Sequence, residues 1–125
     1  MRSLPILLAA LILTTPAHAF IAQNGLVVEG QGGGFTVPWR GPSGAVDFWC
    51  AAGDYVIRAQ NQPPATPIYR VSVPPRRAGE GMEFSLSPDR AAPSTGVLTL
   101  FAGHAGAMSA ASAQSYCEVT HKRQK

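Results

Sequence analysis

The chain has 125 residues, 46% of them hydrophobic, and a formal net charge of +3 at pH 7. That length suits one domain with a modest core and leaves no room for a second domain. The charge excludes a nucleic-acid surface, because residues 122–125 carry three of the ten basic side chains and residues 20–121 hold six arginines against seven acidic residues.

Residues 1–19 have the order of a cleavable signal peptide. Arg2 gives the positive start, an apolar run extends from Leu4 to Leu13, and Ala17-His18-Ala19 matches the small-residue cleavage pattern. The apolar run is about half of the roughly 20 residues that a membrane-spanning helix requires. We therefore expect export to a periplasm or to the medium, and no membrane span in the mature protein.

Removal of residues 1–19 leaves a chain that begins at Phe20. We expect residues 20–121 to form a single domain and residues 122–125 to form a basic disordered tail. The sequence holds two cysteines, Cys50 and Cys117. In oxidising surroundings an even pair predicts a disulfide bond.

The first predicted element of the mature chain is a short hairpin. Two apolar segments, 26–28 and 35–39, flank the glycine-rich run 30–34, which predicts a turn between loosely paired edge strands. Pro38 argues against a central position in a sheet, because proline cannot donate to the ladder.

Residues 43–61 predict an amphipathic helix, with Ser43 as its N-cap and prolines at 63 and 64 that force its end. The apolar positions recur at steps of three and four residues: Val46, Trp49, Cys50, Gly53, Val56 and Ile57. We expect the solvent face to carry Asp47, Asp54, Arg58 and Asn61. Asp54 and Arg58 are spaced for an ion pair, and Gly53 on the buried face predicts close approach by another element.

Three strands are predicted next, at 68–73, 82–87 and 97–102. In the first we expect Tyr69, Val71 and Val73 to face inward against Arg70 and Ser72. In the second we expect Met82, Phe84 and Leu86 to face inward, and the third is apolar on both sides. Consecutive strands commonly pair, so an antiparallel three-stranded meander follows.

The last predicted element is a helix over 109–118, with Ala110, Ala113 and Cys117 on one face. The expected fold is α+β: the meander packs with an N-proximal helix and a C-terminal helix, the disulfide joins the two helices, and the hairpin lies N-terminal to them.

Three segments of the chain resemble small exported bacterial proteins of unknown function. They are the run Phe48-Trp49-Cys50-Ala51-Ala52-Gly53-Asp54-Tyr55, the run Pro67-Ile68-Tyr69-Arg70 and the run Phe84-Ser85-Leu86. The resemblance implies no activity and no site residue.

The candidate catalytic groups are few. After Phe20 the histidines are His104, in a predicted turn, and His121, in the basic end, and we expect both to be exposed with no nucleophile-elbow pattern beside them. Two histidines and a disulfide-bonded cysteine pair do not make a metal site. The run 30–34 lacks the last glycine of a phosphate-binding loop, so no cofactor is predicted.

Two places are candidate contacts. Trp39 and Arg40 precede Ser43 at the start of the first helix, where free amides and a guanidinium could hold a carboxylate or phosphate; packing or solvation of these side chains is the alternative. Arg76 and Arg77 lie in the proline- and glycine-containing loop 74–81, which suits contact with a partner.

From these patterns we expect a non-catalytic binding or accessory protein of the cell envelope, with no cofactor and an unidentified partner. One alternative is an inhibitor-like module that presents loop 74–81 to a partner protein. A second alternative is a small exported hydrolase, which requires His104 in a cleft beside a serine or a carboxylate.

Overall fold

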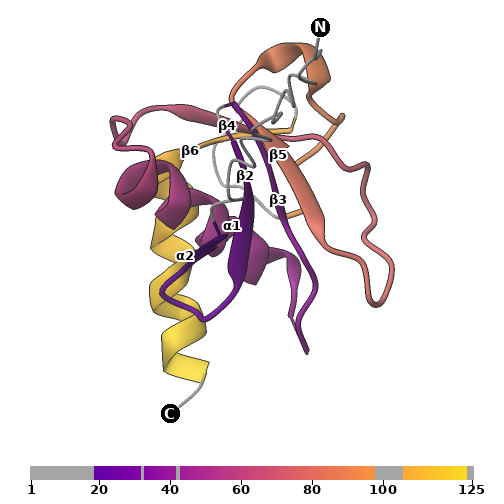
Figure 1. Cartoon of the computed structure of the whole chain (residues 1–125). Coiled ribbons are helices and arrows are strands. Elements are labelled where there is room, and N and C mark those ends of the chain that lie inside the picture. The colour runs from indigo at the N-terminus through magenta and orange to yellow at the C-terminus, as the bar shows by residue number, and fades with distance from the viewer. Residues whose placement is uncertain (1–18, 32, 42, 98–105, 124–125) are drawn as a thin grey trace, which may run out of the picture.

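The computed structural model describes residues 19–31, 33–41, 43–97 and 106–123, and these form an α+β fold (Figure 1). Six strands make one antiparallel sheet in the order β1-β2-β3-β5-β4-β6. The strands are β1 (Ala19–Ile21), β2 (Val27–Gln31), β3 (Gly34–Val37), β4 (Pro67–Arg70), β5 (Met82–Ser85) and β6 (Ala107–Ser109). The two α-helices are α1 (Ala45–Asp54) and α2 (Ala110–Arg123). A π-helical turn (Tyr55–Ala59) extends α1, and a short 3-10 helix (Pro88–Arg90) follows β5.

The N-terminal hairpin is present as β2 and β3, which pair from Glu29↔Thr36 to Gln31↔Gly34. Its predicted edge position is wrong, because β3 lies between β2 and β5 in the sheet. The strand ends at Val37, one residue before Pro38. The missing amide of the proline therefore falls outside the ladder, and β3 can accept a neighbour on each side.

β4 and β5 pair antiparallel as predicted, with Arg70 opposite Phe84. The predicted phase of β4 is wrong by one residue. Ile68 and Arg70 are buried, whereas Val73 is 68% exposed. Directly opposed residues of an antiparallel pair lie on the same face, so the pairing places Arg70 on the face where Phe84 is buried.

The predicted third strand of the meander, 97–102, falls almost entirely outside the described residues. The described partner on the other side of β4 is β6, through Ile68↔Met108. The predicted meander is thus matched in its β4–β5 hairpin, and the sheet extends beyond it through β1, β2 and β3 on one side and β6 on the other.

The first predicted helix is present, with a different cap. Gly44 is the N-cap rather than Ser43, and its backbone amide donates to Asp47 Oδ2 at 2.7 Å. The carboxylate of Asp47 therefore caps the helix from its first turn.

At the other end, after the π-helical turn, Asn61 takes a left-handed φ of 52° ahead of Pro63.

α1 is buried on nearly all sides rather than along one stripe. Every residue from Phe48 to Val56 is buried, including Asp54, which has no exposed surface. The prediction that Asp54 faces solvent is wrong, because α2 covers that side of α1. The predicted ion pair from Asp54 to Arg58 is confirmed, at 2.8 Å.

The two helices touch where Gly53 meets α2. A Cβ at Gly53 would collide with the backbone nitrogen of Gln114 and lie 2.8 Å from the carbonyl oxygen of Ala110, so the predicted close approach is confirmed. The Cys50–Cys117 disulfide, also predicted, joins the helices nearby with its Cα atoms 4.9 Å apart.

α2 is longer than predicted. It runs to Arg123, so Lys122 and Arg123 are helical rather than part of a disordered tail. No proline or glycine follows Glu118 in the sequence, and nothing there stops a helix. The predicted buried face of Ala110, Ala113 and Cys117 is confirmed.

The core lies between the helices and one face of the sheet. Its aromatic side chains contact one another in a row: Tyr55 packs on Phe35, Phe35 stacks on Phe84, and Trp49 meets Phe84 edge-on.

Within the described ranges, no helix has both the length and the apolar character needed to cross a bilayer.

Candidate functional site

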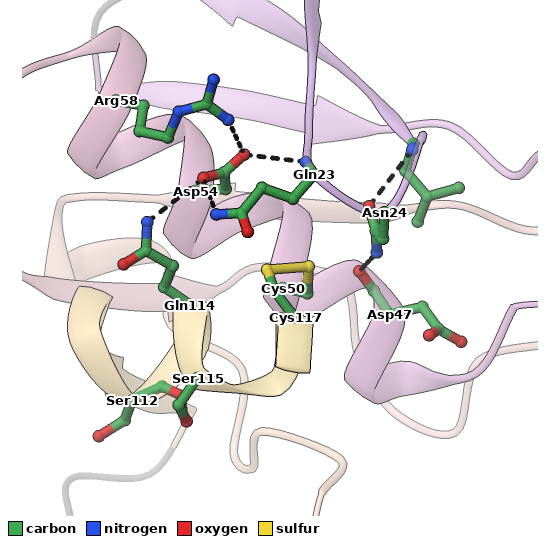
Figure 2. Close-up of a disulfide and its surroundings, with 11 residues drawn as sticks. Gln23, Asn24, Asp47, Cys50, Asp54, Arg58, Ser112, Gln114, Ser115 and Cys117 are labelled. Atoms are coloured by element: carbon green, nitrogen blue, oxygen red, sulfur yellow. Dashed lines mark hydrogen bonds and ion pairs between the residues drawn. A yellow bond between two sulfur atoms is a disulfide. The ribbon is translucent and has the colours of Figure 1, made fainter. Parts of the chain in front are cut away.

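Strand β1 leads into a turn that is hydrogen-bonded to α1. Asn24 holds this turn, since its Nδ2 donates to the carbonyl oxygen of Asp47 at 2.7 Å and its Oδ1 accepts from the amide of Leu26 at 3.3 Å. Such local amide bonds are typical of asparagine in turns. The turn is therefore fixed to α1 (Figure 2).

Asp54 joins the same turn to both helices. Its carboxylate accepts four hydrogen bonds: from the amide and the Nε2 of Gln23 at 3.0 and 2.7 Å, from Arg58 Nη1 at 2.8 Å and from Gln114 Nε2 at 3.3 Å. Figure 2 shows these donors converging on the carboxylate just above the disulfide. A buried charge with donors on both oxygens is stabilised where an unpaired one is not.

A pocket of about 540 Å³ opens beside this network, and we call it the edge pocket. Its lining residues come from the end of β1, the turn, the π-helical extension of α1 and the last turns of α2: Ile21, Ala22, Gln23, Asn24, Arg58, Cys117, Glu118 and His121. The side chain of Arg58 is 51% exposed, Ile21 is 68% exposed, and Glu118 and His121 are exposed.

The edge pocket offers several kinds of contact. Arg58 supplies a cation, Glu118 a carboxylate, His121 an imidazole one helical turn further on, and Ile21 an apolar rim. Its described lining residues include no serine or threonine, and Cys117 is disulfide-bonded. This set suits recognition by charge, hydrogen bonds and apolar contact.

The pocket also adjoins an open strand. Among the described residues, β1 pairs only with β2, and it ends at Ile21, which lines the pocket. An edge strand presents unpaired backbone donors and acceptors to another extended chain. The backbone of β1 and the side chains of the pocket therefore form one continuous surface.

The predicted site at the start of α1 has a different arrangement from the one expected. Trp39 is 44% exposed and Arg40 is exposed, while the carbonyl oxygen of Ser43 accepts from Arg76 Nη2 at 2.6 Å. The N-cap amide of the helix is taken by Asp47. An anion at this end would compete with that carboxylate.

Arg76 and Arg77 differ in their surroundings. Arg76 donates to the carbonyl oxygens of Ser43, Arg77 and Glu80, and its guanidinium carbon lies 4.8 Å from the centre of the Phe48 ring. Arg77 is exposed. Arg76 therefore fastens loop 74–81 to α1, and Arg77 is the arginine that a partner could reach.

Of the two histidines after Phe20, His104 lies outside the described residues. His121, which the sequence analysis placed in the basic end of the chain, is on α2 and lines the edge pocket. Within the parts of the chain that the structure describes, no group of three histidine, cysteine or acidic residues is placed to hold a metal ion.

No protein-family model, no curated protein and no solved structure matches this chain.

Proposed function

We propose that this protein is a small exported binding module without catalytic activity, and that it holds an extended segment of a partner protein along β1 and in the edge pocket. The observation that carries the proposal is the continuity between the free edge of β1 and the pocket lined by Ile21, Arg58, Glu118 and His121. Peptides commonly bind by adding a strand to an open edge, with side chains held in adjoining pockets.

Export is part of the proposal. It is supported by the signal-like order of residues 1–19 and by the disulfide, which persists in oxidising compartments. The described part of β1 begins at Ala19, the residue that precedes the expected cleavage point. The mature chain would therefore start within the strand that we assign to partner binding.

The inhibitor-like alternative rests on loop 74–81. Because Arg76 is engaged by three backbone carbonyls and a ring, partner contact in that loop would depend on Arg77. The hydrolase alternative depends on His104 and stays a prediction.

Site-specific photo-crosslinking distinguishes partner binding at the edge pocket from partner binding at loop 74–81. A benzophenone side chain would replace Glu118 in one variant and Arg77 in a second, each produced in the organism that encodes the protein. We expect a covalent adduct from position 118 and none from position 77. Adding Ile21→Lys should lower the yield about tenfold, since it removes an apolar contact of the rim.

The opposite pattern, with an adduct from position 77 alone, would replace the proposal with the display-loop alternative. Absence of an adduct from both positions would reject both binding surfaces.

A further inference from the structure

The disulfide anchors α2 immediately before the part of the helix that lines the edge pocket. Cys117 is bonded to Cys50 on α1 and is 6% exposed. Beyond Cys117, every α2 residue whose side chain the structure describes is exposed: Glu118, Val119, His121 and Lys122. Figure 1 shows the C-terminal turn of α2, in yellow, projecting beyond α1. The positions of Glu118 and His121 therefore depend on the anchor at Cys117.

The other anchors of this part of α2 lie further back along the helix. Tyr116 is partly buried against the core, and Gln114 donates to Asp54 at 3.3 Å. Helix ends fray because their last carbonyl groups lack intrahelical partners, and a short helical segment without tertiary contacts is marginal in water. Without the disulfide, fraying would extend back through the pocket wall toward Gln114.

The facing wall of the pocket is fixed independently of the sulfur atoms. Arg58 pairs with Asp54 at 2.8 Å, and Asn24 donates to the carbonyl oxygen of Asp47 at 2.7 Å. The contact at Gly53 and the hydrophobic core do not involve the disulfide either. Opening the bond should thus release one wall of the pocket and leave the core packed.

The pocket also gives a thiol a route to the bond. Cys117 is among the residues that line it, whereas Cys50 has no exposed surface. A thiolate in the pocket would form a sulfur–sulfur bond with Cys117 and release Cys50 as a thiolate. The second thiolate of a dithiol would then displace Cys117, so that the protein gains two electrons and the dithiol becomes a disulfide.

We propose that the Cys50–Cys117 bond is a redox switch of the edge pocket. In the bonded form α2 holds its wall of the pocket in place, and reduction by a dithiol releases that wall while the core stays folded. This inference rests on the proposed function, since it assigns regulation to the same partner-binding site. The state of the wall is measurable without a partner, so the switch and the proposed function can fail separately.

NMR Cα chemical shifts of residues 118–121 measure the wall directly. The disulfide-bonded protein is compared with the same protein reduced by dithiothreitol and with the double variant Cys50→Ala, Cys117→Ala. We expect the helical shifts to fall by about half or more in both, because a short unanchored helical end is marginal. The Nε1–H resonance of Trp49, which donates to the carbonyl oxygen of Thr95 inside the fold, should keep its position.

Photo-crosslinking from position 118 measures the effect on partner binding. The adduct yield of the double variant should fall by about the same factor as its helical shifts, because only the fraction with the wall in place binds. Ser115→Ala, on the exposed side of α2, is the matched control and should change neither readout.

Unchanged shifts at residues 118–121 without the bond, or equal adduct yields with and without it, would overturn the switch and leave the proposed function standing. Loss of the Trp49 resonance would also overturn the switch, because the disulfide would then hold the whole fold. If the disulfide-bonded protein gives no adduct, the proposed function is rejected, and the NMR comparison alone decides whether the bond holds the wall.

Access to the bond through the pocket is tested by the rate of reduction, followed by alkylation of the freed thiols and intact mass. Dithiothreitol should reduce the folded protein at a rate that low concentrations of urea leave unchanged. A rate that rises with urea as unfolding does would overturn the route through the pocket.

Discussion

Among the described residues, the fold buries two charged side chains, and their surroundings are opposite. Asp54 accepts four hydrogen bonds, from residues of a turn, of the π-helical turn that extends α1, and of α2. Within the described ranges, the guanidinium of Arg70 makes one hydrogen bond, to the backbone carbonyl of Thr95. A satisfied buried charge ties elements together, whereas an unsatisfied one adds an unfavourable term to the free energy of folding.

Removing the disulfide is the strongest way to test whether Asp54 alone holds the helices. The double variant Cys50→Ala, Cys117→Ala opens a crosslink across 67 residues. We expect a loss of about 4 kcal/mol in the free energy of unfolding, because the unfolded chain regains the freedom of that loop. Urea denaturation of the oxidised unaltered protein and of the double variant measures this loss. A loss near zero would mean that the noncovalent contacts, the Asp54 network among them, hold α1 against α2 without the crosslink.

Removing the hydrogen-bonded charge of Asp54 should cause the second largest loss of stability. Asp54→Ala leaves Gln23, Arg58 and Gln114 without their common acceptor, and the position is fully buried. We expect a loss of about 3 kcal/mol in the free energy of unfolding, again by urea denaturation. Asp89→Ala, at an exposed acidic position, should change stability little. Equal effects at the two positions would contradict the role of Asp54 as a junction.

Removing the unsatisfied charge should have the smallest effect. Arg70→Met keeps much of the length of the side chain and removes a buried cation that has two donors without a partner among the described residues. We expect the free energy of unfolding to stay within about 1 kcal/mol of the unaltered protein, or to rise, because apolar replacement of a buried charge is often neutral or stabilising. A loss as large as that of Asp54→Ala would show that Arg70 is satisfied within the fold.

The sequence could predict features that local patterns determine, but not those that depend on contacts between distant residues. The disulfide, the β2–β3 hairpin, both helices and the close contact at Gly53 follow from local patterns and from the export that residues 1–19 predict. The burial of Asp54 does not, since its partners Gln23 and Gln114 lie 31 and 60 residues away. Periodicity identifies one apolar stripe of α1, but it does not reveal that a second helix covers the opposite side.

Arg70 and the edge pocket were missed for related reasons. The alternation in 68–73 fits either phase, and pairing with Phe84 decides which one is buried. The pocket combines a turn after β1 with the end of α2, and no local pattern joins these segments. The run Gln23-Asn24-Gly25 is a turn signal that could have located one half of it.

The disulfide also makes the chain a partly closed ring. The segment between Cys50 and Cys117 includes β4, β5 and β6, whereas β1, β2 and β3 precede it. A protease that nicks the exposed backbone after Arg77 would cut inside the ring, so both fragments would stay on one molecule until a reductant is added. A gel run without reductant would then report an intact protein whose 74–81 loop had already been cleaved.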